Sequence, residues 1–107
     1  MFKVHLVKSC TGEYEDYRES IIKGFVDKNK AEEFLKSCED YFKNQFDTVE
    51  VKDEDYFAEE GDYYDEPLYR NEEYIKNSPC GMIYIDYTGV SFSLEEVEVE
   101  KWNIVIV

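Results

Sequence analysis

The chain has 107 residues, of which 43% are hydrophobic and 17% aromatic, and its formal net charge is −14. A chain of this length is predicted to form one domain, residues 1–107, and its hydrophobic content argues against global disorder. Because the negative charge repels nucleic acid and anionic membrane surfaces, a direct nucleic-acid binder and a membrane-surface protein are both disfavoured. We expect an electrostatic partner to be basic.

Neither a membrane span nor a secretory signal is apparent in the sequence. No apolar run approaches the ~20 residues that cross a bilayer, and the N-terminal residues lack a charged start followed by an apolar block and a cleavage site. The three cysteines, Cys10, Cys38 and Cys80, form no closely spaced pair, which favours reduced thiols over a disulfide framework. These features predict a cytoplasmic protein.

The N-terminal quarter of the chain reads as two strands joined by a loop. Apolar residues alternate with others from Phe2 to Val7, which is typical of a strand. Residues 9–17 contain a turn-like Thr11-Gly12 pair. A second strand is predicted from Arg18 to Val26, with Gly24 as a bulge or a point of close approach. The two strands should form a long-looped hairpin.

An amphipathic helix is predicted from Lys28 to Asn44. Asp27 is its expected N-cap, because the carboxylate can accept hydrogen bonds from the free amides of the first turn. The apolar residues recur at the spacing of one helical face and are Ala31, Phe34, Leu35, Cys38 and Phe42. Glu32 and Glu39 each precede a lysine by four residues, the favoured orientation for helical ion pairs. We expect this helix to lie across one face of a sheet.

A C-terminal hairpin is predicted around Thr88-Gly89, because a two-residue loop that ends in glycine suits a tight turn. The implied register pairs Tyr87 with Val90, Ile85 with Phe92 and Ile83 with Leu94, and it places all six side chains on one face. Glu95-Glu96 interrupts the alternation, as a bulge would. The alternation resumes at Val97 and Val99 and continues through Trp102, Ile104 and Ile106. The predicted fold is α+β: a mainly antiparallel sheet of four or five strands, one long helix packed on one face, and a long acidic loop.

That acidic loop, residues 53–77, follows a short β-prone segment, Thr48–Val51. Its first part, residues 53–74, holds ten acidic residues against one basic residue, Arg70, with six aromatic residues interleaved. It has no steady period, so we expect an irregular loop with a helical turn near Tyr69–Ile75. The loop is either solvated, with tyrosines that cover the core, or a partner-binding surface. The partner-binding residues would then be Asp53, Glu54, Asp55, Tyr56, Glu59, Glu60, Asp62, Tyr63, Tyr64, Asp65 and Glu66.

No arrangement of reactive residues predicts an enzyme, a metal site or a cofactor site. The spacing of ligands in a calcium-binding EF-hand loop fails at Phe57 and Ala58 when it is started at Asp53. His5 and Cys10 are near each other in sequence, but no third group marks a Cys–His pair. We expect His5 on a partly exposed strand face and Cys38 in the core of the helix. Glycine-rich phosphate loops are also missing from the sequence.

Two segments resemble a set of small phage and bacterial proteins without assigned function. Residues 12–17, Gly-Glu-Tyr-Glu-Asp-Tyr, resemble a G-x-Y-S-D-Y pattern, and residues 24–34 resemble a G-V-F strand end followed by a K-x-x-A-E-x-F helix. Residues 91–99 are similar to a strand near the C-terminus of those proteins. Glu15 stands where serine is usual, and Arg18–Ser20 are extra residues. The resemblance implies a mobile-element setting and a small α+β fold, and it transfers no catalytic residue.

The acidic-aromatic composition leads to two functional hypotheses. In the first, a phage- or mobile-element-encoded protein acts in the host cytoplasm and inhibits a basic, nucleic-acid-binding host factor such as a defence nuclease, by DNA mimicry of the anti-CRISPR type. An extended acidic segment has one charge per ~7 Å, so mimicry needs further acids alongside it. These could be Glu13, Glu15 and Asp16 or Glu95, Glu96, Glu98 and Glu100. In the second, the chain is a structural accessory domain that forms homo-oligomers through strands such as Trp102–Val107.

Overall fold

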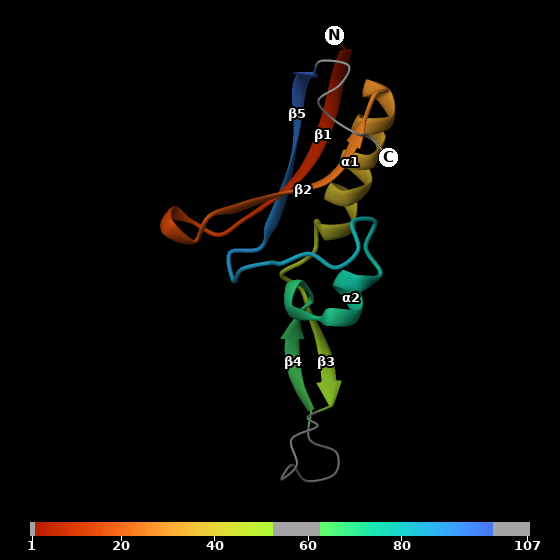
Figure 1. Ribbon diagram of the computed structural model, residues 1–107. Helices are drawn as coiled ribbons and strands as arrows, with labels where there is room; N and C mark the ends of the chain where they lie inside the picture. Colours follow the sequence, from red (N-terminus) through yellow and green to blue (C-terminus); the bar gives the residue numbers. More distant parts are fainter. Residues whose placement is uncertain (1, 53–62, 100–107) are drawn as a thin grey trace.

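The computed structural model describes residues 2–52 and 63–99, which form an α+β fold with two antiparallel sheets and one main helix (Figure 1). The elements in chain order are β1 (Phe2–Thr11), η1 (Tyr14–Asp16), β2 (Arg18–Phe25), α1 (Lys28–Phe42), β3 (Thr48–Lys52), β4 (Tyr63–Pro67), η2 (Leu68–Arg70), α2 (Glu72–Lys76) and β5 (Val90–Val99). The α+β class is confirmed. In the described residues, however, the strands form one sheet of three and one of two instead of a single larger sheet.

The three-stranded sheet has the order β2-β1-β5, so β1 pairs on both edges. The β1–β5 register runs without a break from Phe2 opposite Val99 to Thr11 opposite Val90, so the bulge expected at Glu95-Glu96 is wrong. The β1–β2 pairing does shift, because β2 carries one extra residue, Ile22. Gly24 is instead the point of close approach, since a Cβ there would lie 3.3 Å from the side chain of Leu6.

Helix α1 begins where predicted and ends two residues early. The Asp27 carboxylate accepts a hydrogen bond from the amide of Asn29 at 2.8 Å, which confirms the N-cap. After Phe42 the chain enters tight turns, with the Gln45 amide donating to the Phe42 carbonyl at 3.1 Å. The ion pair on this helix joins Lys28 to Glu32 and neither predicted pair is formed.

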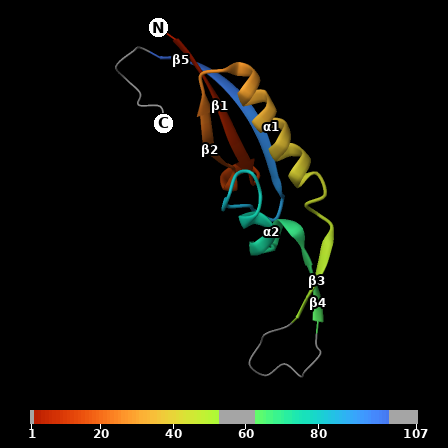
Figure 2. The ribbon, with the colours of Figure 1, turned by 90° about the vertical axis from the view of Figure 1, so that its right-hand side faces the viewer.

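One face of the three-stranded sheet is covered by α1 (Figure 2). The Phe42 ring lies 5.6 Å from that of Phe92, which stands opposite Ser9 of β1. Because side chains alternate between the faces of a strand, His5 and Val7 lie on this covered face as well, and both are buried. His5 is therefore not on a partly exposed face, and that expectation is wrong.

Residues 83–87 do not form the predicted hairpin with β5. Strand β5 pairs with β1 along its whole length, and residues 83–86 have no regular secondary structure. Ile83 and Ile85 pack against the core cluster of Phe42, Ile75 and Val90. The turn before β5 does form, because the Gly89 amide donates to the Asp86 carbonyl at 2.8 Å, but the Thr11 hydroxyl accepts from the Asp86 amide at 2.8 Å. The Thr11 hydroxyl, at the end of β1, therefore bonds to the Asp86 amide and the Gly89 carbonyl, which the predicted hairpin would have placed in its own turn.

The second sheet is the β3–β4 ribbon, which projects from the end of the molecule opposite to the N-terminus (Figure 1). An irregular loop was expected over Tyr63–Pro67, so that part of the prediction is wrong. The helical turn expected near Tyr69–Ile75 is confirmed as η2 and α2. Hydrogen bonds from the amides of Leu68 and Tyr69 to the carbonyls of Asp47 and Gln45 fix the base of the ribbon.

Candidate partner-binding surface

The β3–β4 ribbon carries the described part of the predicted binding surface. Tyr63 and Tyr64 are 56% and 48% exposed, so they do not cover the core. Asp65 follows them on the same strand and is exposed, whereas Glu66 is half-buried. The other predicted residues, Asp53, Glu54, Asp55, Tyr56, Glu59, Glu60 and Asp62, lie outside the described residues.

Two carboxylates face each other across the ribbon. Glu50 of β3 stands directly opposite Asp65 of β4, so their side chains lie on the same face. Like charges in this position destabilise a ribbon. The ion pairs found among the described residues involve other carboxylates. The ribbon therefore presents two facing carboxylates that form no ion pair among the described residues, although Lys52 lies on the same face of β3, two residues from Glu50.

Glu66 differs from its neighbours because its carboxylate has a structural partner. It accepts a hydrogen bond from the Asn71 side-chain amide at 3.0 Å, and the Asn71 side-chain oxygen caps α2 by accepting from the Tyr74 amide at 2.9 Å. Glu66 thus helps to join the ribbon to α2. We therefore assign Glu66 a structural role in holding the ribbon against α2.

A groove of about 510 Å³ lies beside the ribbon, between β3 and α2. Val49 and Val51 line one side, and Tyr41 and Tyr74 line another. The two tyrosine rings stack with their centroids 4.6 Å apart, and each hydroxyl donates to the backbone carbonyl of the other residue. The groove therefore has a fixed wall that an aliphatic side-chain stem could contact.

The described acids that mimicry would require do not lie alongside the ribbon, and Glu100 lies outside the described residues. Glu13, Glu15 and Asp16 belong to the β1–β2 loop, which projects in a different direction (Figure 1). On β5, Glu95 lies 2.9 Å from the ammonium group of Lys8, and Glu96 lies near Lys3 and His5. The described acids are distributed over separate projections, and those of β5 have basic neighbours.

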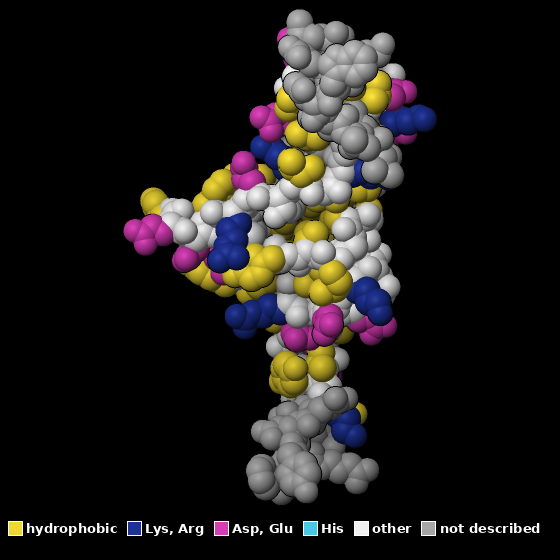
Figure 3. Space-filling model, viewed as in Figure 1, with side chains coloured by type: hydrophobic (Ala, Val, Ile, Leu, Met, Phe, Trp, Pro, Cys, Tyr) yellow, Lys and Arg dark blue, Asp and Glu magenta, His cyan; other side chains and the backbone are white. Residues whose placement is uncertain are grey.

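The β1–β2 loop is a second acidic-aromatic surface, of which the sequence indicated the acids but not the exposed Tyr14. Tyr14 is 95% exposed and has a positive φ of 53°, which is strained for an aromatic residue. The loop is fixed by a hydrogen bond from the Gly12 amide to the Thr88 hydroxyl at 3.0 Å. Figure 3 shows hydrophobic and acidic side chains together at the tip of this projection. The only signal in the sequence was a tyrosine within the acids that follow a turn glycine.

An ion-pair network crosses the sheet at the base of this loop. The Lys8 ammonium lies 3.3 Å from Glu19 and 2.9 Å from Glu95, and the Tyr17 hydroxyl donates to Glu19 at 2.7 Å. The Tyr17 hydroxyl and then Lys8 hold the pKa of the Glu19 carboxyl below its usual range. Glu95, more than Glu19, raises the pKa of Lys8. Lys8 therefore joins β1 to β2 through Glu19 and to β5 through Glu95, so the network orders the sheet.

The predicted core position of Cys38 is confirmed, and the geometry separates Cys10 from His5. Because Cys10 and His5 are five residues apart on β1, their side chains lie on opposite faces of the strand and cannot form a Cys–His pair. Cys38 is fully buried, and burial followed by the nearby Cys80 raises the pKa of its thiol to about 12. Cys80 accepts a hydrogen bond from the Ser78 hydroxyl at 3.6 Å.

Over residues 2–52 and 63–99, no group of three or more His, Cys, Asp or Glu side chains is arranged to hold a metal ion. Within the same ranges, no helix is both long and apolar enough to cross a membrane. No protein-family model, curated protein or solved structure matches this chain.

Proposed function

We propose that this chain is a non-catalytic binding protein that holds a basic partner protein on its acidic and tyrosine-rich projections. In the biological setting that we propose, a phage or mobile element encodes it, and the partner is a host factor, such as a defence nuclease, whose basic surface normally contacts nucleic acid. The observation that carries the proposal is the β3–β4 ribbon, where Glu50 and Asp65 face each other beside exposed Tyr63 and Tyr64.

Stability of the fold does not account for the composition of this ribbon. A two-stranded ribbon is marginal in water, and facing carboxylates weaken it further. Tyr63 and Tyr64 contribute little to the core because about half of each side chain remains exposed. A partner that supplies lysine or arginine side chains would neutralise Glu50 and Asp65 and bury the tyrosines. Tyrosine is also enriched among the residues that dominate binding energy in protein interfaces.

The arrangement favours pairing with individual basic side chains over imitation of a regular phosphate array. Residues on one face of a strand recur every ~7 Å, whereas duplex DNA carries one charge per ~1.7 Å of its axis. The described acids do not close this gap, because those of the β1–β2 loop lie on another projection (Figure 1). We therefore propose that the chain competes with nucleic acid by occupying basic side chains of its partner.

The test is affinity capture from a bacterial lysate at low and high salt with a matched pair of double variants. Glu50→Gln with Asp65→Asn removes the facing charges from the ribbon. Glu33→Gln with Asp40→Asn removes the same charge from the exposed side of α1 and serves as the control. We expect the ribbon variant to lose a partner that the control retains, and the wild-type complex to dissociate near 1 M salt, where the screening length is only ~3 Å.

The captured protein is then tested for nucleic-acid binding with and without this chain. Competition between the two ligands would support occlusion of a nucleic-acid surface. Capture that is unchanged by high salt, or lost equally in the ribbon and α1 variants, would refute the electrostatic proposal.

A further inference from the structure

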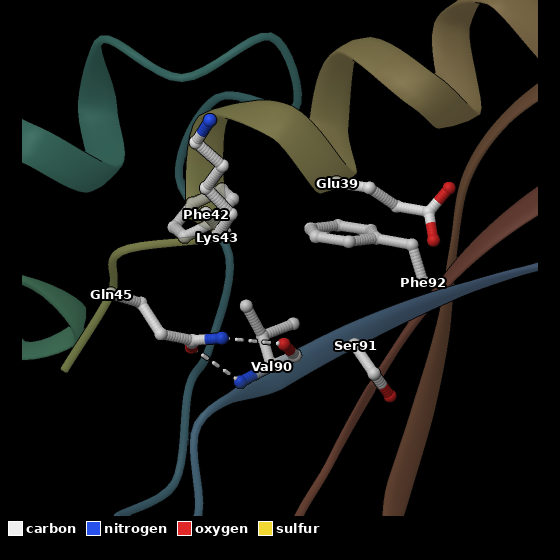
Figure 4. Close-up of a pocket in the computed structure, with 7 residues that line it drawn as sticks. All are labelled: Glu39, Phe42, Lys43, Gln45, Val90, Ser91 and Phe92. Atoms are coloured by element: carbon white, nitrogen blue, oxygen red, sulfur yellow. Dashed lines mark hydrogen bonds between the residues drawn. The ribbon is translucent and has the colours of Figure 1, made fainter.

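The outer edge of β5 contains a local substitute for a neighbouring strand. The side-chain amide of Gln45 donates from Nε2 to the Val90 carbonyl at 2.9 Å, and its Oε1 accepts from the Val90 amide at 2.8 Å (Figure 4). An adjacent antiparallel strand makes the same two bonds to one residue. Gln45 therefore occupies the first position that a fourth strand would take beside β5.

The bonds at Val90 establish which backbone groups of β5 point outward. In an antiparallel pair, successive residues alternate between bonding to the neighbour on one side and facing the other side. Because Val90 faces outward and the β1–β5 register is unbroken, the amides and carbonyls of Phe92, Leu94 and Glu96 face outward as well. Among the described strands, none pairs with this edge.

There is also space beside this edge for the side chains of an added strand. A cavity of about 230 Å³ separates the last turns of α1 from the start of β5, and Glu39 and Lys43 line it from the helix (Figure 4). Figure 4 shows the Phe92 ring directed toward α1 and the Ser91 side chain directed away. A strand beside β5 would place alternate side chains in this space, against Phe92.

The opposite edge of the sheet is less suited to strand addition. Strand β2 contains the extra residue Ile22, which interrupts its regular ladder, and its exposed residues include Arg18 and Lys23. A bulge of this kind protects an edge strand from further pairing. Strand β5 has an unbroken register over ten residues. Of the two outer edges of this sheet in the described residues, β5 is the one with a regular register, and a cavity adjoins it.

We propose that the β5 edge is a strand-addition site for an extended, basic segment of a partner protein. Three acids are exposed along β5, Glu95, Glu96 and Glu98, against two lysines of β1 that pair with them, so lysine or arginine in the added strand would complement the remaining negative charge. A second copy of this chain is disfavoured as the occupant because each copy has a net charge of −14. The site uses backbone pairing at β5 and does not depend on the role proposed for the β3–β4 ribbon.

The experiment measures amide hydrogen exchange by NMR in the full chain, with and without a short synthetic peptide of alternating lysine and valine. At a peptide concentration about ten times its Kd, exchange at Phe92 and Leu94 should slow about tenfold, because only unbound protein exchanges freely. The amides of Ser91 and Ser93, which face β1, should not change. A peptide with glutamate in place of lysine, and a lysine–valine peptide with alternate amides N-methylated, should both fail to protect Phe92 and Leu94.

Two variants separate backbone pairing from charge. Glu96→Pro removes an outward-facing amide, and Glu96→Ala removes the same carboxylate but keeps the amide. We expect at least a tenfold weaker affinity for the peptide in the first variant than in the second. Absence of peptide binding, equal protection by the N-methylated peptide, or protection of Phe92 and Leu94 that rises with protein concentration without peptide would each overturn the proposal.

Discussion

Replacement of Gln45 by leucine should destabilise the protein by more than the loss of one ordinary hydrogen bond, because this side chain makes two. Gln45 lies in the turn after α1, is 9% exposed, and forms both of its hydrogen bonds to Val90, which is 7% exposed. Leucine has a similar size but no hydrogen-bonding group. Gln45→Leu would therefore leave the amide and the carbonyl of Val90 without partners in a buried position, where water cannot readily replace them.

The expected loss can be worked out from these two backbone groups. Each buried group left without a partner costs about 1–3 kcal/mol, and we expect a combined loss of about 3 kcal/mol because leucine regains some apolar contact. Domains of this size have total stabilities of about 5–15 kcal/mol. With a shift of about 4–8 °C per kcal/mol, the Tm should fall by at least about 12 °C.

Gln45→Glu provides a matched variant with the same shape and a titratable group. Above its pKa, the buried carboxylate can accept from the Val90 amide but cannot donate to the Val90 carbonyl, and both burial and the facing carbonyl oxygen raise its folded-state pKa. Folding therefore favours proton binding. Relative to wild type, this variant should be less stable at neutral pH and should recover stability as the pH falls toward about 4.3, the ordinary glutamate pKa.

Guanidinium denaturation and thermal denaturation, followed by circular dichroism at pH 7 and near pH 5, measure both effects. A loss within about 0.5 kcal/mol for Gln45→Leu would show that the Val90 bonds contribute no more than an ordinary surface contact. A Gln45→Glu deficit that stays constant or grows on acidification would contradict the assigned direction of the two hydrogen bonds.

Two further predictions concern the glycine turns and the buried thiol. Gly12 and Gly81 both have positive φ, so replacement by alanine should lower the free energy of unfolding by about 1–2 kcal/mol at each position. The loss should be larger at Gly12, where a Cβ would lie 2.1 Å from the Asp16 carbonyl oxygen. At Gly81 a Cβ would meet nothing within 4 Å. Equal Tm losses would refute this packing. Because burial raises the pKa of Cys38 to about 12, iodoacetamide at pH 8 should alkylate the half-buried Cys10 and Cys80 before Cys38. Peptide mass spectrometry measures the three rates, and equal rates would contradict the burial of Cys38.

Local signals in the sequence were sufficient for β1, β2 and α1. Burial of one face produces the apolar period of α1, and the Asp27 cap marks the start of this helix. The two strands were recognised from their β-prone residues, because no residue of β2 is buried and the buried face of β1 is largely polar. The β3–β4 ribbon gives no such signal. Because Tyr63, Tyr64 and Asp65 are all exposed, no buried face imposes an alternating pattern on them. The sequence pattern of an exposed ribbon therefore cannot be distinguished from that of an irregular loop.

The C-terminal hairpin failed for a different reason. Alternation at Ile83 and Ile85 does reflect burial, but against the core cluster around Phe42 instead of in a ladder. A period of two identifies an extended segment without identifying its neighbour. The contacts that decide the pairing come from Thr11, which is more than seventy residues away from Asp86 and Gly89 and bonds to both. Local pattern reasoning cannot include an interaction of that range.

For the candidate site, the sequence predicted the residue types but not their grouping. Tyr63 and Tyr64 are exposed beside carboxylates, as a binding surface requires. Tyr14 was missed because its positive φ and its exposure are set by the loop that begins at Gly12. The sequence analysis also offered Glu95 and Glu96 as further acids for mimicry, whereas the structure places them beside basic side chains of β1.

The distribution of the basic side chains explains how the charge of the chain becomes concentrated on the projections. Lys3 and Lys8 form ion pairs on the three-stranded sheet, and Lys28 forms one on α1. Glu50 and Asp65 on the ribbon take no part in these ion pairs. Among the described residues, the ion pairs lie on the three-stranded sheet and on α1, and the acids of the projecting ribbon and of the β1–β2 loop join none of them. A field of this shape would attract a basic partner toward the exposed tyrosines before contact, so charge removal from the ribbon should slow association more than charge removal from α1.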